Sequence, residues 1–182
     1  MQFKLKGNFE VVDFNKWLED CILRAVELTT KYVEKDFKDT YLSGAYSLEM
    51  LKKLDHPFAR RHYNFLLSIK NPSVIARLLK GKVFKGVKLD VVNIQEGILS
   101  KSLSRIKTEK TGNKVVGKVK ISIEKCPYAK YVFYGTSRMI PRPVHLIYAI
   151  YHKNEIIKIF NKKLLTIAKR RINAFMKKYK VQ

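Results

Sequence analysis

The stretch from Cys126 to Leu146 constrains the fold more than any other part of the chain. It reads CPYAKYVFYGTSRMIPRPVHL: four aromatic residues, then Gly-Thr, then two prolines that flank an arginine. Each proline fixes its own φ and biases the preceding residue toward extended geometry, while Gly135 can adopt a positive φ at no steric cost. The sequence therefore predicts a helix-like aromatic segment, a glycine pivot and a stiff arm that projects from the domain. Such a segment suits the presentation of a surface better than it suits catalysis.

The same stretch resembles a motif of the tail-completion proteins (head-to-tail joining, minor tail or neck proteins) of tailed bacteriophages, Y-A-x-Y-V-x-aromatic-G-T-x-x-M-x-x-R-P followed by a helix. The matching residues are Tyr128, Ala129, Tyr131, Val132, Tyr134, Gly135, Thr136, Met139, Arg142 and Pro143. The family usually has an acid at the position of Phe133 and an aromatic residue at that of Val144, so no role of the acid carries over. Two further segments resemble the family: Gly97–Leu103, which resembles its Gly-x-Leu-x-x-Ser motif, and the Asp-His-Pro-Phe-Ala segment that begins at Asp55.

The resemblance implies a virion structural protein that forms a homo-oligomeric ring at the junction of head and tail, ends the tail and docks it to the capsid. The implied partners are further copies of the chain, head connector or adaptor proteins, tail tube or tail terminator proteins, and packaged DNA. The implied location is the virion and, during assembly, the host cytoplasm. The residues expected to contact neighbouring subunits or the tail are Tyr128, Tyr131, Phe133, Tyr134, Gly135, Thr136, Met139, Ile140, Arg142 and Pro143.

Net charge narrows the classes of partner. The 182 residues include 38 Lys and Arg against 15 Asp and Glu, a formal net charge of +23. Such an excess attracts polyanions or acidic protein surfaces, although it could also serve solubility alone. Sequence-nonspecific nucleic-acid binding is therefore the alternative function. The cations expected to meet DNA or an acidic partner are Lys118, Lys120, Lys162, Lys163, Lys169, Arg170 and Arg171.

Catalysis and membrane insertion find little support. The sequence has no nucleophile elbow, zinc-protease, Walker or dinucleotide-binding motif, and no cofactor is expected. No segment approaches the roughly 20 apolar residues of a membrane span. Cys21 and Cys126 form no C-x-x-C pair, so we expect buried free thiols. Asp55, His56 and His62, with Cys126 as a remote fourth ligand, could hold a metal, but a structural turn is the favoured interpretation.

The remaining pattern predicts one α+β domain over residues 1–182, in which a small, mainly antiparallel sheet is packed by a long N-terminal and a long basic C-terminal helix. The N-terminal helix follows Asp13, which is placed to cap it. A hairpin is expected between Leu99 and Ile123, with Thr111-Gly112-Asn113 as its turn. The expected parts are a helical part at 1–55 with a second helix at 43–54, the sheet at 63–123, the aromatic-to-proline loop at 126–146 and the C-terminal helix at 147–180. Within the sheet region we expect strands at 63–71 and 83–92, the second broken or bulged at Gly86, and between them a short helix capped by Ser73.

Overall fold

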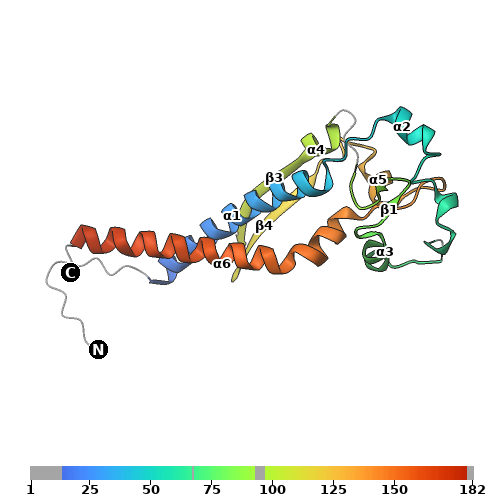
Figure 1. The fold of residues 1–182 in the computed structure, drawn as a ribbon. Helices are drawn as coiled ribbons and strands as arrows, with labels where there is room; N and C mark the ends of the chain where they lie inside the picture. Colours follow the sequence, from blue (N-terminus) through green and yellow to red (C-terminus); the bar gives the residue numbers. More distant parts are fainter. Residues whose placement is uncertain (1–13, 67, 93–96, 180–182) are drawn as a thin grey trace.

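The structure, a computed structural model, describes residues 14–66, 68–92 and 97–179 and confirms the α+β class. The molecule is elongated: helices α1 (Phe14–Tyr41) and α6 (Val144–Tyr179) form an antiparallel stalk with a β-hairpin along α1, and the other short elements gather in a head at one end (Figure 1). With 36 residues, α6 is about 54 Å long. The other elements are α2 (Leu48–Lys53), the 3-10 turns η1 (Arg60–His62) and η2 (Asn64–Leu66), α3 (Pro72–Leu79), β1 (Val83–Phe84), β2 (Val87–Lys88), α4 (Ile98–Ser102), β3 (Leu103–Thr111), β4 (Lys114–Ile121) and α5 (Ala129–Tyr134).

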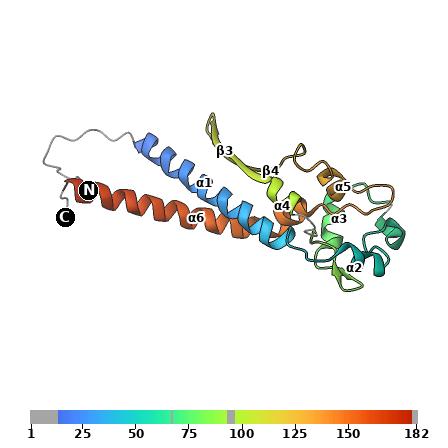
Figure 2. The same cartoon turned by 90° about the horizontal axis from the view of Figure 1, so that it is seen from above.

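Helix α1 lies between α6 and the β3–β4 hairpin (Figure 2). Its polar contacts include Asp20–Arg171 (3.5 Å) and Tyr32–Glu155 (2.6 Å) to α6, and Glu19–Lys110 (2.6 Å) and Glu34–Arg105 (2.8 Å) to the hairpin. Apolar residues recur at helical spacing along α1, and among them Cys21 and Ala25 are fully buried, whereas Leu18 is 37% exposed. Because the side chains of Cys21 and Ala25 are small, the backbone of α1 can approach its neighbours closely. Asp13, the expected cap, lies outside the described residues.

The β3–β4 hairpin has the predicted turn, with Gly112 at φ +57 between Thr111 and Lys114. On β4, the residues of one parity, Val119 among them, are half-buried against α1, while Lys118 and Lys120 are exposed. Gly117 brings the strand closest to the helix, because a Cβ at this position would lie only 2.0 Å from the Thr30 hydroxyl oxygen. The first arm is shorter than expected, since residues 99–102 belong to α4 and β3 begins only at Leu103.

The expected strand over 63–71 is wrong for the described residues of that range. The chain instead forms the turn η2, and the side chains of Tyr63 and Leu66 are both buried. Residues three apart lie on the same side of a turn but on opposite faces of a strand, so burial of both favours the turn. The Tyr63 hydroxyl group also donates a 2.6 Å hydrogen bond to the Pro57 carbonyl oxygen.

Other boundaries also differ from the expected ones. Residues 83–92 form two short paired strands, not one bulged strand, because Lys85 and Gly86 both have positive φ and make a tight turn. Helix α2 begins only after Ser47, whose side chain caps it, and α3 is capped by Asn71 and not by Ser73. Helix α6 begins at Val144, directly after the second proline of the Pro-Arg-Pro segment.

The hydrophobic core lies in the head and at its junction with the stalk. Its largest fully buried residues are Tyr41, Leu42, Pro57, Leu79, Val87, Cys126, Ile140, Pro143, Val144 and Ile147. Both cysteines are buried free thiols, as expected. The Pro-Arg-Pro segment is part of this core, so the predicted projection of the arm is wrong. Its prolines and arginine are enclosed between η1, α3 and the start of α6 instead of reaching into solvent.

Candidate interaction site

Helix α5 carries three exposed tyrosines on one face. Its buried side consists of Ala129, Val132 and Phe133. The other side, which we call the tyrosine face, consists of Tyr128, Tyr131 and Tyr134, whose exposed fractions are 42%, 48% and 70%. The tyrosines follow each other at three-residue steps, so they share one face of the helix. Tyrosine offers a large apolar ring with a polar end, and protein interfaces are enriched in it.

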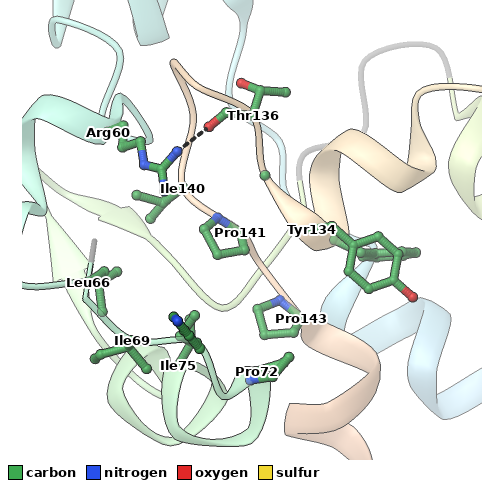
Figure 3. Close-up of a pocket in the computed structure, with 13 residues that line it drawn as sticks. Arg60, Leu66, Ile69, Pro72, Ile75, Tyr134, Thr136, Ile140, Pro141 and Pro143 are labelled. Atoms are coloured by element: carbon green, nitrogen blue, oxygen red, sulfur yellow. Dashed lines mark hydrogen bonds between the residues drawn. The ribbon is translucent and has the colours of Figure 1, made fainter.

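The loop after α5 is clamped by hydrogen bonds at several points. Gly135 has φ +75, which confirms the predicted pivot. Thr136 caps the loop: its hydroxyl group accepts from the Met139 backbone N–H at 3.0 Å, and its own N–H donates to the Met139 carbonyl oxygen at 2.9 Å. The Arg60 guanidinium donates a 3.1 Å hydrogen bond to the Thr136 carbonyl oxygen (Figure 3). The backbone N–H of Ile140 donates to the Phe58 carbonyl oxygen at 3.0 Å. These bonds fix the direction in which the chain leaves the tyrosine face.

Seven of the ten predicted contact residues are less accessible than expected. Ile140, Arg142 and Pro143 are buried within the chain, and Phe133 is only 9% exposed. Gly135, Thr136 and Met139 are partly buried and shape the loop. Among the predicted contact residues, only those of the tyrosine face are exposed, and the others are buried or shape the loop that follows.

Arg142 ties the loop to the head. Its guanidinium carbon lies 3.9 Å from the centre of the Phe58 ring, and Nη1 donates a 3.5 Å hydrogen bond to the Val91 carbonyl oxygen. No described carboxylate pairs with it, and burial lowers the pKa of Arg142 to about 10. The side chain is still charged at neutral pH. Burying this charge costs free energy, and that cost cancels part of the stabilisation that packing against Phe58 provides.

Arg142→Met should therefore change the free energy of unfolding by no more than about 1 kcal/mol, because methionine keeps most of the stem and removes the buried charge. Arg142→Ala should cost about 2–4 kcal/mol, because it leaves a cavity beside Phe58. Urea denaturation of both variants measures the difference. If methionine proves as costly as alanine, the charge and not the packing holds the loop.

Two clefts flank the tyrosine face. The proline cleft has a volume of about 330 Å³ and is lined mainly by apolar side chains. The basic side chains of Arg60 and Lys70 also border it. Its apolar lining consists of Leu66, Ile69, Pro72, Ile75, Ile140, Pro141 and Pro143 (Figure 3). The hairpin cleft, about 300 Å³, is lined by Val33, Phe37, Leu103, Val119, Ile121, His145 and Tyr148. Phe133 and Tyr134 border both clefts, so Tyr134 stands as a ridge between two apolar hollows.

His145 lies in the hairpin cleft, 5.2 Å from the Phe133 ring and 6.3 Å from the Tyr134 ring. Its Nδ1 atom is buried and has no hydrogen-bond partner. Burial lowers the pKa of His145. The unfolded chain therefore takes up a proton at higher pH than the folded protein does, and the stability that the neutral imidazole provides is lost as the pH falls below about 6.5.

We expect the wild-type protein to lose more stability than His145→Phe when the pH falls from about 7 to about 5. Phenylalanine keeps a ring of similar size in the apolar cleft and has no proton to gain. Urea denaturation at several pH values measures the two slopes, and the difference between them isolates His145 from the other titrating groups. Equal slopes would mean that the imidazole is solvated in the folded protein.

The predicted cationic contacts lie on two elements that α1 separates. Lys118 and Lys120 are exposed on β4, and Lys118 lies 4.0 Å from Glu109. The cations on α6 are exposed, except for Arg171, which is half-buried and lies 3.5 Å from Asp20. Within the described ranges, no ion pair involves Lys162, Lys163, Lys169 or Arg170. The predicted cations therefore lie on two elements, β4 and α6, with α1 between them (Figure 2).

A polar cluster at the junction of head and stalk was not predicted from the sequence. Its hydrogen bonds join Tyr148 to Asp36 (2.8 Å), Tyr32 to Glu155 (2.6 Å), and Lys80 to Tyr41 (3.1 Å). His152 lies at its centre, with Nδ1 3.4 Å from both Asp36 and Glu155. Burial and the bond to Asp36 raise the pKa of Tyr148. Its contacts between α1 and α6 join residues more than 100 positions apart, and Lys80 and Tyr41 are 39 positions apart, so no local spacing signals the cluster. It locks α6 to α1 at the point where both enter the head.

The described residues show no cluster suited to metal binding. They contain no group of three or more His, Cys, Asp and Glu placed to hold a metal ion. Asp55 accepts a hydrogen bond from Arg61 and lies 3.4 Å from His62, which is the contact pattern of a turn. None of the helices in the described part of the chain is both long and apolar enough to cross a bilayer. Compared with protein-family models, curated proteins and solved structures, the chain shows no match.

Proposed function

We propose that this chain is a virion structural protein that assembles into a ring at the head-to-tail junction of a tailed bacteriophage, ends the tail and docks it to the capsid connector. The observation that carries the proposal is the tyrosine face: three exposed rings at α5, directly before a clamped loop, with Tyr134 bordering a cleft on each side. The motif that resembles the tail-completion proteins runs through the same residues. Its Gly-Thr, Met and Arg-Pro positions explain the rigidity of the loop, and its tyrosines supply the exposed surface.

A closed ring needs two different complementary surfaces on each subunit, so that each copy uses one surface toward one neighbour and the other toward the next. In this proposal the ridge of Tyr134 and the two clefts that it borders form one of these surfaces. Burial of tyrosine rings in such clefts is the pattern expected of the residues that dominate interface energy. In this proposal the protein works by shape complementarity repeated by symmetry, with no chemical step.

Light scattering after size exclusion, combined with negative-stain electron microscopy, tests the proposal on the full chain. We expect a discrete oligomer and ring-shaped particles, either for the protein alone or after addition of connector or tail terminator proteins from a tailed phage. A strict monomer that binds none of these proteins would refute it.

Sequence-nonspecific nucleic-acid binding is the second candidate function. It is favoured by the exposed lysines and arginines on α6, most of which have no acidic partner within the described ranges. Contacts to phosphates release counterions, so binding to a DNA duplex of arbitrary sequence should weaken steeply with salt. Sequence-selective binding that survives high salt would contradict both candidate functions.

A further inference from the structure

The outer side of α6 carries a row of exposed aliphatic residues. Ile150, Ile157, Leu165 and Ile172 are 37%, 47%, 61% and 49% exposed. We call them the aliphatic row. Their spacing of seven, eight and seven residues keeps them within about 80° of one another around a straight α-helix, over a length of about 33 Å. Helix α1 lies beside α6 (Figures 1 and 2), and its printed contacts with α6 use other residues, among them Glu155 and Arg171.

Lysines border the row on both sides. Lys158, Lys162 and Lys169 follow one edge at helical spacing, and Lys153 lies at the other edge. All four are exposed, and none forms an ion pair with a described residue. The whole of α6 has nine Lys and Arg against one acid, Glu155, and the Glu155 carboxylate already accepts a hydrogen bond from Tyr32. The surface is therefore a row of aliphatic side chains between cationic edges, with the exposed Asn154 and Asn161 between its members.

From this combination we infer that the outer face of α6 binds an acidic amphipathic helix of a partner protein. Such a helix would cover the aliphatic row with its own apolar stripe and meet the lysines with Glu or Asp at its edges, as in a coiled coil with complementary flanking charges. The inference concerns a surface of the stalk that is separate from the tyrosine face, and it does not depend on the proposed ring.

Other partners fit this combination of an aliphatic row and flanking lysines less well. A second copy of α6 would place lysines against lysines, which costs stability through like-charge repulsion. A DNA backbone would pair with the lysines but would leave the aliphatic row facing phosphates, which gain nothing from apolar contact. An anionic membrane would match both features in kind, but the row is a narrow stripe and not the wide apolar face of an interfacial helix.

The probe for the test is a synthetic helical peptide of about four heptads, with Leu at the seam positions and Glu at the flanking positions. A matched peptide carries Gln in place of each Glu. Binding of both to the full-length protein is followed by fluorescence anisotropy. We expect the Glu peptide to bind roughly tenfold or more tightly than the Gln peptide at low salt, and the difference to shrink as salt is added. Equal binding of the two peptides would overturn the inference.

Variants then locate the surface. Leu165→Asp and the triple variant Lys158→Glu, Lys162→Glu, Lys169→Glu should each weaken binding of the Glu peptide by roughly tenfold or more. Ile123→Asp is the matched apolar control, because Ile123 is also 61% exposed but lies after β4. The charge control is Lys52→Glu, Lys53→Glu, Lys88→Glu, which gives the same net charge with exposed lysines of the head. Both controls should bind as the wild type does. All substituted positions are exposed, and circular dichroism checks that each variant folds.

Three outcomes contradict the inference. In the first, the controls weaken binding as much as the α6 variants, so the peptide binds elsewhere. In the second, the peptide fails to bind while a DNA duplex binds and its affinity depends on the α6 lysines but not on Leu165, so the face is a polyanion site. In the third, vesicles of phosphatidylcholine and phosphatidylglycerol bind through Leu165 while the peptide does not, so the face is a membrane contact. Loss of oligomers in tyrosine-face variants, with peptide binding retained, would leave the inference intact and identify a failure of the ring proposal alone.

Discussion

Gly135→Ala should lower the free energy of unfolding by about 3 kcal/mol or more, the largest effect we expect from a single added methyl group in this protein. Gly135 has φ +75 and ψ −176, a backbone conformation that is almost restricted to glycine. A Cβ atom there would also lie 2.7 Å from the Pro141 nitrogen and 2.8 Å from the Met139 carbonyl oxygen. Both neighbours are backbone atoms of the clamped loop, so they cannot move aside cheaply.

Gly81→Ala provides the matched control. Gly81 also has a positive φ, +68, but a Cβ atom there would meet nothing within 4 Å. Its alanine variant should therefore cost only the conformational strain, about 1 kcal/mol. Urea denaturation of the two variants separates strain from collision. If Gly135→Ala is no worse than Gly81→Ala, the loop is not packed against the glycine as the structure has it.

Gly117→Ala should lower the free energy of unfolding by about 1–3 kcal/mol. Alanine in a strand is normally favoured over glycine by roughly 0.5–1 kcal/mol, so the sign of the change is informative. The cost arises because the new Cβ would lie 2.0 Å from the Thr30 hydroxyl oxygen and 3.0 Å from a Val26 methyl carbon. Thr30 cannot rotate freely away, since its hydroxyl group donates a 2.8 Å hydrogen bond to the Val26 carbonyl oxygen. The hairpin must then move away from α1.

A double-mutant cycle tests this cause. Thr30→Ala removes the atom in closest contact, so Gly117→Ala should cost less in the Thr30→Ala background than in the wild type, by about 1 kcal/mol or more. Additive effects of the two substitutions would show that the hairpin and α1 do not meet at Gly117. Both free energies come from urea denaturation curves with the slope compared between variants, because a changed slope would signal a looser folded state.

The long elements were predictable because their signals are local. The apolar stripe of α1, the alternation along β4 and the Gly-Asn turn each depend on residues within a few positions of one another. The pivot at Gly135 follows from the same kind of reasoning. For the candidate site, the sequence predicted the tyrosines of α5 as contact residues, and the structure places Tyr128, Tyr131 and Tyr134 at the surface.

The features that the sequence could not predict depend on contacts between residues that are far apart in the chain. An arginine between two prolines is typical of an exposed arm, yet Arg142 is buried because the ring of Phe58, far away in the chain, covers its guanidinium. The aromatic residues around Tyr63 favour a strand, but no neighbouring strand pairs with them, and packing against Pro57 and the head core produces a turn. The polar cluster around His152 likewise joins residues of α1 and α6 with Lys80, which directly follows α3.

The central claim is that the tyrosine face joins subunits, and light scattering of three alanine variants tests it most directly. Tyr131 and Tyr151 are both 48% exposed, and each has a lysine near its ring, so Tyr151→Ala on α6 is a close control for Tyr131→Ala on α5. We predict that Tyr131→Ala and Tyr134→Ala reduce the wild-type oligomer to smaller species at equal concentration with the urea midpoint unchanged, while Tyr151→Ala keeps the oligomer. An oligomer that survives both α5 substitutions, or that Tyr151→Ala disrupts equally, would contradict the claim.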